Sequence, residues 1–399
     1  MLSCTIMLIS LLPGLDNTLT REPGLEEVQQ AIESQGLDWQ AGETPVSSLK
    51  PEEFRKLLIP PSLMEKALAS FTRSSDYTPP QIPATGLPDA LDWRNRGGVS
   101  FITPVRDQAQ CGSCWAFGSL AAVESIFLIR NKTPFDGTND VDLSEQDIID
   151  CSDSGGCNGG GTWGKLPAYL ENYGVSYESC YPYKAADNAC RAASCTDRVK
   201  TQSHVPIALL GPMGPDDRKI IDRLRAEIFW RPVPVSLAVY SDFRFYKSGV
   251  YMESQDATIE GYHAVSLIGW NEKDQAWIVK NSWGPDWGEN GFFRIKYWAS
   301  GIGSMAMRFE MQEQDKADFC NLPANIELDP KHPERFRMLR LENCGGAPGP
   351  WIARSDKPWL SIEPGNGEIV PGGHQDIKLE YTGSGPKDGE SALLHIQVT

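Results

Sequence analysis

The chain has 399 residues, of which 40% are hydrophobic, and its 53 acidic against 37 basic residues give a formal net charge of −16. This length is too great for one hydrophobic core and predicts two or three domains of a soluble globular protein. The acidic excess argues against a nucleic-acid partner, because phosphate groups bind positively charged surfaces.

The N-terminal 15 residues are apolar, and the run from Ile6 to Leu12 is too short to span a bilayer. No Lys or Arg precedes Arg21, so the positively charged start of a signal peptide is missing. The cysteine content requires an oxidising environment, and this argument outweighs the missing charge. We therefore predict a signal peptide over residues 1–20 and a secreted or extracytoplasmic protein, with a lysosome-like compartment if the source is eukaryotic. No other stretch suits a membrane span.

Residues 21–86 form a separate small segment followed by a linker. Leu25 to Gln35 is typical of an amphipathic helix, and Pro51 to Leu58 of a second helix with Pro in its first turn. Residues 74–88 are rich in Ser, Pro and Gly, a composition that stays extended and accessible to proteases.

The main domain is predicted over residues 87–315. Its first half reads as helices and loops, with an apolar helix from Cys114 through Phe127, a helix that begins after Ser144, and a Gly-rich stretch at 155–161. Its second half reads as short strands, at residues 233–239, 263–268, 276–280 and 291–295. A helical half beside a β half predicts an α+β domain with a cleft between them.

Residues 316–399 have a different pattern. Ile377, Leu379 and Tyr381 alternate with charged residues, and a similar alternation ends the chain. We predict a small all-β sandwich in which Trp351 and Trp359 belong to the core. Cys320 and Cys344 lie where a disulfide could join two parts of this domain.

Ten cysteines give an informative count. Cys4 lies in the predicted signal peptide, and nine remain, an odd number. If eight of them form four disulfides in an oxidising compartment, one thiol is left, and such a thiol is either intermolecular or reactive. Cys114 is the candidate, because it begins the predicted apolar helix, where the helix dipole lowers the pKa of a thiol.

Cys111-Gly-Ser-Cys114 permits three interpretations: half a zinc site, a redox pair, or a disulfide cysteine beside a nucleophile. Zinc needs two further ligands, but only His204 and His263 lie in this domain, far apart in sequence, so we expect no metal. A thioredoxin-like pair needs a strand before the motif and a βαβ unit after it, and neither is evident. The third interpretation is favoured.

Two downstream motifs complete the pattern. His263 lies in Gly-Tyr-His-Ala-Val, and Asn281 begins Asn-Ser-Trp-Gly-Pro-Asp-Trp-Gly. With Cys-Gly-Ser-Cys-Trp before them, in the order Cys, His, Asn, the chain resembles a papain-family cysteine peptidase of the cathepsin kind over about residues 87–310. The resemblance implies a two-lobed fold with a helical and a β-barrel-like lobe, polypeptide substrates, no cofactor and a monomer.

The resemblance also implies roles for individual residues. Cys114 would be the nucleophile and His263 its base, and Asn281 would orient the imidazole. Gln108 would donate a side-chain N–H to the oxyanion, together with the backbone N–H of Cys114. The reaction would pass through a thioester, as in a cysteine endopeptidase.

The same resemblance predicts a substrate cleft. Gly159 and Gly160 would hold the substrate backbone in an extended pose, and Trp283 would shield the His–Asn hydrogen bond from water. No acidic residue stands among the five expected to line the pocket for the second residue before the cut, so we predict a preference for apolar side chains there. Those five residues are Gly161, Thr162, Ala238, Tyr262 and Met307.

Further expectations follow from the family. Disulfides are implied between Cys111 and Cys157, between Cys151 and Cys190, and between Cys180 and Cys195. Residues 21–86 become an inhibitory pro-segment, in which Trp39 to Gly42 is similar to the propeptides of cathepsin B. The absence of a long insertion after Gly160 predicts an endopeptidase, and the C-terminal domain resembles the Ig-like modules of secreted bacterial enzymes.

Two other functions stay open from the sequence. A thiol acyltransferase would use the same Cys, His and oxyanion donors, with an amine in place of water. A binding protein would act through the C-terminal β domain, with the papain-like part as a scaffold. The presence of Cys114, His263, Asn281 and Gln108 together favours the peptidase.

Overall fold

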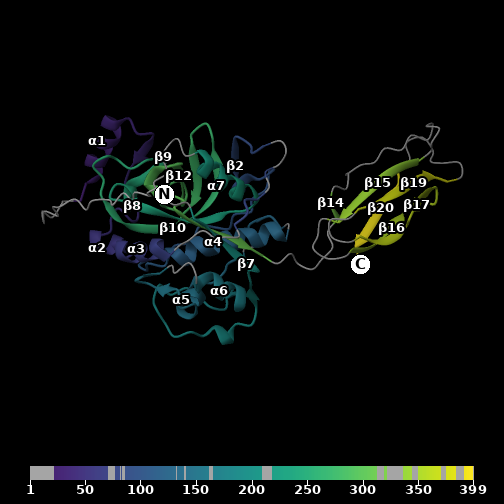
Figure 1. Cartoon of the computed structure of the whole chain (residues 1–399), viewed down its shortest axis with the longest axis horizontal. Coiled ribbons are helices and arrows are strands. Elements are labelled where there is room, and N and C mark those ends of the chain that lie inside the picture. The colour runs from purple at the N-terminus through teal and green to yellow at the C-terminus, as the bar shows by residue number, and fades with distance from the viewer. Residues whose placement is uncertain are drawn as a thin grey trace, which may run out of the picture.

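The computed structural model describes most of the chain (Figure 1). The described ranges are 22–70, 77–80, 82, 86–131, 133–138, 141–160, 165–208, 218–311, 319–320, 336–343, 349–369, 374–382 and 391–398. The predicted signal peptide, Gly161, Thr162 and Cys344 lie outside these ranges, as does the side chain of Cys320. Within them, no helix is both long and apolar enough to cross a membrane.

The N-terminal segment folds as small elements on the surface of the main domain. Helix α1 (Leu25–Gln35) has the predicted bounds and ends at Gly36, whose positive φ of 63° suits glycine. Strand β1 (Trp39–Ala41) and helices α2 (Pro51–Arg55) and α3 (Pro61–Ser70) follow. Helix α2 is three residues shorter than predicted, because Leu57 and Leu58 leave the helix and are buried against the main domain. Helix α3 was not predicted.

Short elements make up the helical lobe of the main domain. Its central helix α4 (Cys114–Arg130) is buried on nearly every side, as its apolar sequence predicts. Helix α5 (Glu145–Cys151) begins where Ser144 Oγ accepts the N–H of Asp147 at 3.0 Å. The remaining elements are α6 (Lys165–Asn172) and the two-residue strands β3 (Gly155–Gly156), β4 (Gly159–Gly160), β5 (Val175–Ser176) and β6 (Arg198–Val199).

A mixed, mainly antiparallel sheet forms the β lobe, in the order β1-β9-β12-β11-β10-β8-β13-β7, with β2 (Ala90–Asp92) beside β10. Strand β1 of the N-terminal segment pairs with β9 and so extends the sheet. The sheet and the 3₁₀ turn η3 (Phe243–Phe245) pack into an aromatic core with Trp270, Trp277 and Trp287. The strands are β7 (Ser203–Ala208), β8 (Val233–Tyr240), β9 (Tyr246–Tyr251), β10 (Ile259–Asn271), β11 (Ala276–Lys280), β12 (Phe292–Lys296) and β13 (Met305–Glu310).

The α+β prediction is confirmed, and the strand predictions match β8, β10, β11 and β12 within a few residues, except that β10 is much longer. Strands β7, β9 and β13 and helix α7 (Arg218–Trp230) of the second half were missed. Helix α7 buries Ile221, Leu224 and Ile228. Their spacing of three and four residues is the signal that would have found it.

The two lobes meet where α4 crosses β10. A Cβ atom on Gly118 would lie 2.9 Å from the carbonyl carbon of Ala264, so only glycine permits this close approach. The contact brings Cys114, the first residue of α4, to the strand that carries His263. The lobe boundary therefore holds both residues. Figure 1 shows α2 and α3 of the N-terminal segment at this boundary, between the sheet and helices α5 and α6.

An all-β unit ends the chain. One sheet has the order β14-β15-β19-β17 and the other β18-β16-β20. Both sheets contribute to one core, in which Leu341, Ile377 and Trp351 are buried, so the predicted sandwich is confirmed. The strands are β14 (Phe319–Cys320), β15 (Phe336–Asn343), β16 (Gly349–Ser355), β17 (Leu360–Glu363), β18 (Asn366–Ile369), β19 (His374–Tyr381) and β20 (Leu394–Val398).

Candidate active site

Among the cysteines whose side chains the structure describes, Cys114 is the one with a free thiol. It begins α4 and is fully buried. Burial raises the pKa of the thiol to about 12, against the opposing effect of backbone hydrogen bonds from Ala264, Trp115 and Cys114 itself. The influence of the Ala264 backbone on this pKa places the thiol close to the strand that carries His263.

His263 is held in one orientation. Its Nε2 lies 2.7 Å from Oδ1 of Asn281, and because an amide oxygen only accepts, Nε2 carries the proton. This leaves Nδ1, which has no other partner among the described residues, as the nitrogen that can exchange a proton with a thiol. The Trp283 ring covers the imidazole at 4.7 Å between centroids. Burial lowers the pKa of His263 to about 4.

Gln108 is also fixed, and its side-chain amide is occupied. Its Oε1 accepts a hydrogen bond from Ser282 Oγ at 2.9 Å, which directs Nε2 toward the cleft. Nε2 donates to the backbone carbonyl of Cys111 at 2.8 Å and to that of Leu57 at 2.9 Å. The Gln108 amide, which the sequence predicted to donate to the oxyanion, therefore donates to a carbonyl oxygen of the N-terminal segment.

The N-terminal segment runs through the whole cleft. Ile59 and Tyr262 exchange two backbone hydrogen bonds, of 2.7 and 2.9 Å, on the β side. On the helical side, a Cβ atom on Gly112 would lie 2.9 Å from the carbonyl oxygen of Lys56, and one on Gly159 would lie 2.9 Å from Pro60. The glycines thus allow the segment to pass between the lobes and to fill the cleft.

A family model described as "Papain family cysteine protease" matches residues 87–310, more than half of the chain. The chain belongs to the papain family of cysteine proteases.

Curated relatives of this chain include falcipain-2b of Plasmodium falciparum, which is 37% identical over 53% of this chain and 42% of its own length. The cathepsin L-like proteinase of Fasciola hepatica is 33% identical over 58% of this chain and 68% of its own length. Vignain of Phaseolus vulgaris is 37% identical over 53% of this chain and 54% of its own. The chain thus spans about half the length of several of the curated relatives that it matches.

Solved structures of proforms have the same fold. The proform of the ragweed pollen cysteine protease Amb a 11 matches with a TM-score of 0.58 at 27% identity, over 72% of this chain and 87% of that one. Digestive procathepsin L2 of Tenebrio molitor matches with a TM-score of 0.55 at 28% identity, over 72% of this chain and 89% of that one.

The disulfides of the described residues lie in the helical lobe. The structure joins Cys111 to Cys157, Cys151 to Cys190 and Cys180 to Cys195. These are the pairs that the family resemblance implied. The first bridge ties the loop before Cys114 to the chain just before Gly159, so it connects the nucleophile's loop to one wall of the cleft.

The predicted substrate residues fall into two groups. Gly159 and Gly160 form β4 and pair with β3, on the helical side. Ala238 pairs with Tyr262 across β8 and β10, and Met307 of β13 is fully buried in one apolar cluster with Ile59 and Met64 of the N-terminal segment. Gly161 and Thr162 lie outside the described residues. The structure thus places Met307 in the same apolar cluster as side chains of the segment.

Sequence reasoning missed several residues that support the site. Ser282 fixes the amide of Gln108, and it follows Asn281 directly in a motif already recognised. Tyr183 donates to the carbonyl oxygen of Gln108 at 2.8 Å, and no local pattern indicated it. Phe54 is fully buried, with its ring centroid 5.6 Å from that of Trp283, and only the folded structure brings these rings together.

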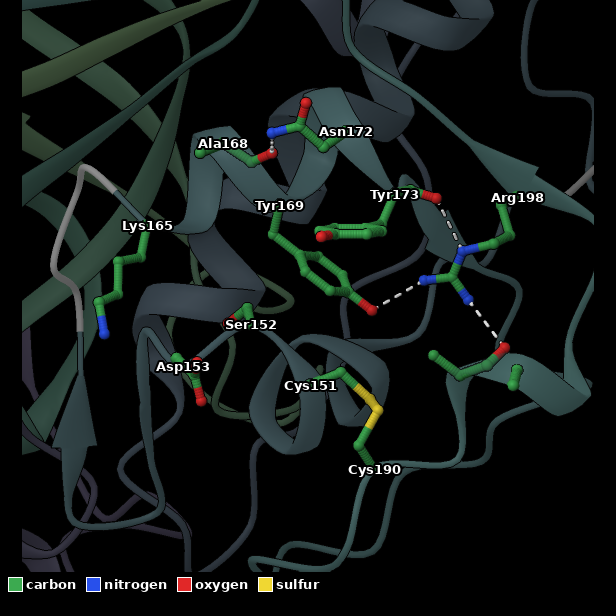
Figure 2. Close-up of a pocket in the computed structure, with 12 residues that line it drawn as sticks. Cys151, Ser152, Asp153, Lys165, Ala168, Tyr169, Asn172, Tyr173, Cys190 and Arg198 are labelled. Atoms are coloured by element: carbon green, nitrogen blue, oxygen red, sulfur yellow. Dashed lines mark hydrogen bonds between the residues drawn. A yellow bond between two sulfur atoms is a disulfide. The ribbon is translucent and has the colours of Figure 1, made fainter.

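A separate cavity of about 660 Å³ lies on the helical lobe, and none of its lining residues belongs to the catalytic set (Figure 2). Tyr169, Tyr173 and the Cys151–Cys190 disulfide border it. The catalytic cleft is instead occupied by the N-terminal segment.

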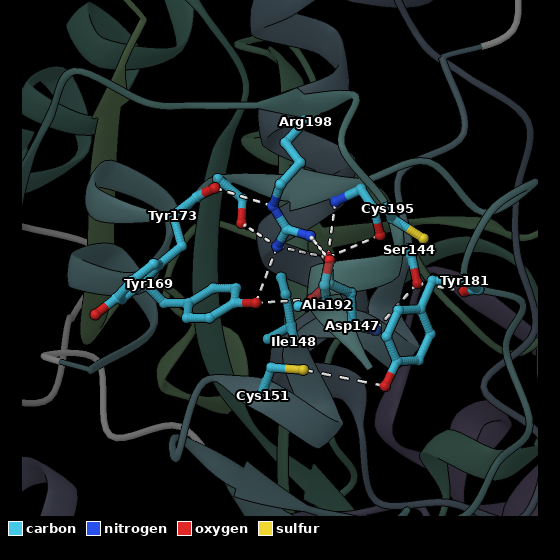
Figure 3. Close-up of polar contacts among 12 residues, drawn as sticks. Ser144, Asp147, Ile148, Cys151, Tyr169, Tyr173, Tyr181, Ala192, Cys195 and Arg198 are labelled. Carbon is cyan, nitrogen blue, oxygen red and sulfur yellow. Dashed lines mark hydrogen bonds and ion pairs between the residues drawn. The ribbon is translucent and has the colours of Figure 1, made fainter. Parts of the chain in front are cut away.

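The polar groups at this cavity serve the fold. Asp147, whose side chain is fully buried, accepts hydrogen bonds from Tyr169 and Ser176 at 2.8 Å and pairs with Arg198 at 2.8 Å (Figure 3). Arg198 also donates to the carbonyl oxygens of Tyr173 and Gly174. These groups are satisfied within the protein, and we assign them the structural task of joining α5, α6 and β6.

Proposed function

We propose that the chain is the zymogen of a cysteine endopeptidase, with Cys114 as nucleophile, His263 as base and Asn281 as the residue that orients the imidazole. The single observation that carries this proposal is the pair formed by His263 and Asn281, which leaves Nδ1 without a partner among the described residues, on the strand whose next residue, Ala264, influences the buried thiol of Cys114. No other partner in the described structure competes for that nitrogen.

The reaction follows from these groups. Nδ1 of His263 takes the thiol proton, and Sγ of Cys114 attacks the peptide carbonyl carbon. Gln108 Nε2, released from Leu57, and the backbone N–H of Cys114 donate to the oxyanion. His263 then protonates the leaving amine as the C–N bond breaks and a thioester forms. Water, deprotonated by His263, cleaves the thioester, and the proton returns to the thiol.

The N-terminal segment acts as the inhibitory pro-segment in this proposal. The leaving amine must lie on the side of His263 and Trp283, since His263 protonates it. The pro-segment places its earlier residue, Phe54, on that side and its later residues, Ile59 and Pro60, beside Tyr262 and Gly159. The pro-segment therefore runs in the opposite chain direction to a substrate. The Leu57 carbonyl group that Gln108 binds is then not oriented for attack by Cys114.

The substrate class is a polypeptide with an apolar side chain at the second residue before the cut. The support is the buried apolar cluster that contains the predicted pocket residue Met307 together with Ile59 and Met64 of the pro-segment. An open cleft without a long insertion after Gly160 favours cleavage inside a chain. We expect an oxidising compartment, secretory or lysosome-like, because six cysteines of the helical lobe are paired.

Labelling with a peptidyl epoxide tests the function. The processed enzyme should label at Cys114 and cleave denatured protein, and the Cys114→Ala variant should do neither. A processed wild-type protein that neither labels nor cleaves would overturn the proposal. Product analysis with an added amine distinguishes hydrolysis from acyl transfer. The C-terminal sandwich, whose Ig-like character stays a proposal, can be removed as a separate arm of the experiment.

A further inference from the structure

Arg244 is a buried cation of the peptidase domain whose side-chain polar partners, among the described residues, come from the pro-segment. It lies in η3 and is only 5% exposed. Its guanidinium pairs with the Glu22 carboxylate at 3.1 Å. It also donates to the backbone carbonyl oxygens of Val46 at 3.1 Å, of Ser47 at 3.0 Å and of Leu49. Its Nε has no partner among the described residues.

The position of Arg244 relative to the catalytic groups follows from a chain of ring contacts. Its guanidinium carbon lies 4.8 Å from the centroid of the Phe54 ring, and that ring lies 5.6 Å from Trp283. Trp283 in turn covers His263 at 4.7 Å. Since His263 protonates the leaving amine in the proposed reaction, Arg244 belongs to the side of the cleft that holds the residues after the scissile bond.

Removal of the pro-segment changes the environment of this arginine more than that of any catalytic group. Every hydrogen bond described for its guanidinium is lost, whereas the bond between His263 and Asn281 stays. A cation in a partly apolar setting, between Phe245 and the site of Phe54, gains most from an anion that replaces Glu22. The structure already shows a carboxylate bound at this position.

We propose that Arg244 is a specificity residue of the mature enzyme that recognises a carboxylate on the leaving-group side, within two residues after the scissile bond. The inference rests on the proposed peptidase function and refines its substrate class. The Glu22 carboxylate stands in for the substrate group. The carboxylate can come from an Asp or Glu side chain or from a free C-terminus close to the cut.

Glu260 is the competing anion on the peptidase domain. It pairs with Arg55 of the pro-segment in the zymogen, and its charge acts on Arg244 as well. Both residues lose their pro-segment partners on activation. The preference for acidic substrates therefore requires that a substrate carboxylate binds Arg244 with a more favourable free energy than the Glu260 carboxylate does.

Matched peptides test the proposal on the processed full-length enzyme. Substrates with the same apolar residue two positions before the cut carry Glu or Gln at the first or second position after it, with amidated ends. We expect kcat/KM to be at least about tenfold higher for Glu than for Gln at one of these positions. A second pair, ending two residues after the cut as free acid or amide, distinguishes a C-terminal carboxylate from a side chain.

Three variants identify the residue responsible. In Arg244→Gln the Glu-to-Gln ratio should fall to about one, and in Arg244→Lys it should stay above one. Glu260→Gln should keep or raise the ratio. The proposal is overturned if the wild type prefers neither a Glu side chain nor a free C-terminus over its neutral counterpart. It is also overturned if such a preference appears only in Glu260→Gln. If Arg244→Gln does not fold, the pH dependence of the wild-type enzyme supplies the second test. The ratio of kcat/KM for Glu over Gln should be lost below pH of about 4, where the substrate Glu is protonated. If the epoxide labels the enzyme but no peptide is cleaved, the peptidase function itself is refuted.

Discussion

The two lobes of the peptidase domain achieve a stable core by different means. The helical lobe consists of short helices and two-residue strands around α4, and residues 111–195 carry three disulfides. The β lobe contains no cysteine between residues 196 and 319. It instead buries a dense group of aromatic rings, among them Trp270, Trp277 and Phe293, beneath a continuous sheet.

The difference has a consequence for catalysis, because the reactive groups are divided between the lobes. Cys114 and Gln108 belong to the side tied by disulfides, and His263 and Asn281 to the side tied by the sheet. The Gly118 contact and the pro-segment hold the two sides together. A site built across such a boundary is active only when both lobes are folded. Variants in either lobe can therefore disturb the site, and the contribution of each lobe can be measured separately.

The largest expected effect comes from the contribution of the helical lobe to the reaction. Cys114→Ala should lower kcat about 10⁶-fold, to the background rate, because Cys114 carries the free thiol among the described side chains and forms the proposed thioester. The measurement is turnover of a peptide substrate by enzyme freed of its pro-segment with an external protease. An unchanged circular dichroism spectrum serves as the folding control. Residual turnover within tenfold of the wild type would assign the nucleophile elsewhere.

The pro-segment spans both lobes, and Phe54 is its most buried contact with the β side. Phe54→Ala should weaken binding of an isolated pro-segment by about 3–5 kcal/mol, since a large ring leaves a cavity against Trp283 and Arg244. The inhibition constant against the mature enzyme measures this change. Glu65→Ala, at an exposed position of α3, is the matched control. Equal constants for the two variants would contradict the docking shown here.

Gln108 connects the lobes through Ser282. Gln108→Ala should reduce kcat about 10²- to 10³-fold, because the oxyanion loses one donor while the thiol and imidazole remain. Steady-state kinetics and the rate of epoxide labelling together test this prediction. Labelling should change far less than turnover. If turnover falls no more than twofold, the amide serves only to hold the loop before Cys114.

Removing one disulfide should loosen only the helical lobe. The double variant Cys180→Ala and Cys195→Ala should lose about 3 kcal/mol of unfolding free energy, since the bridge closes a short loop with a sequence separation of 15. Hydrogen exchange should accelerate in α5 and α6 and stay slow in β10 and β11. Uniform acceleration in both lobes would show that they unfold as one unit.

The smallest expected effect concerns the pH dependence of the thiol at the lobe boundary. Burial raises the pKa of Cys114 to about 12, so at pH 7 the covered enzyme holds almost no thiolate. Alkylation of the zymogen should therefore rise about tenfold per pH unit between 7 and 9. Removing the pro-segment hydrates the site, lowers the pKa and should raise the rate at pH 7 at least tenfold. Similar rates at pH 7 before and after removal would contradict this.

Local patterns predicted a large part of the fold. Helix α1 and strand β11 have the expected bounds, and α4 begins at the expected residue, because periodicity and capping act over a few residues. The loss of the last turn of α2 was not predictable in this way. Leu57 and Leu58 would suit a helix, but burial in the cleft between two distant segments decides their conformation.

Three motifs in the order Cys, His and Asn indicated the candidate site from the sequence alone, together with the chemistry that thiol, imidazole and amide groups support. Only the tertiary structure decided which nitrogen of His263 remains free, that a pro-segment carbonyl occupies Gln108, and that Arg244 is buried against backbone carbonyl oxygens of the pro-segment. The reason is physical. Residue type and short-range spacing set the chemistry of each group, whereas its partners come from segments up to 222 residues apart, which only folding brings together.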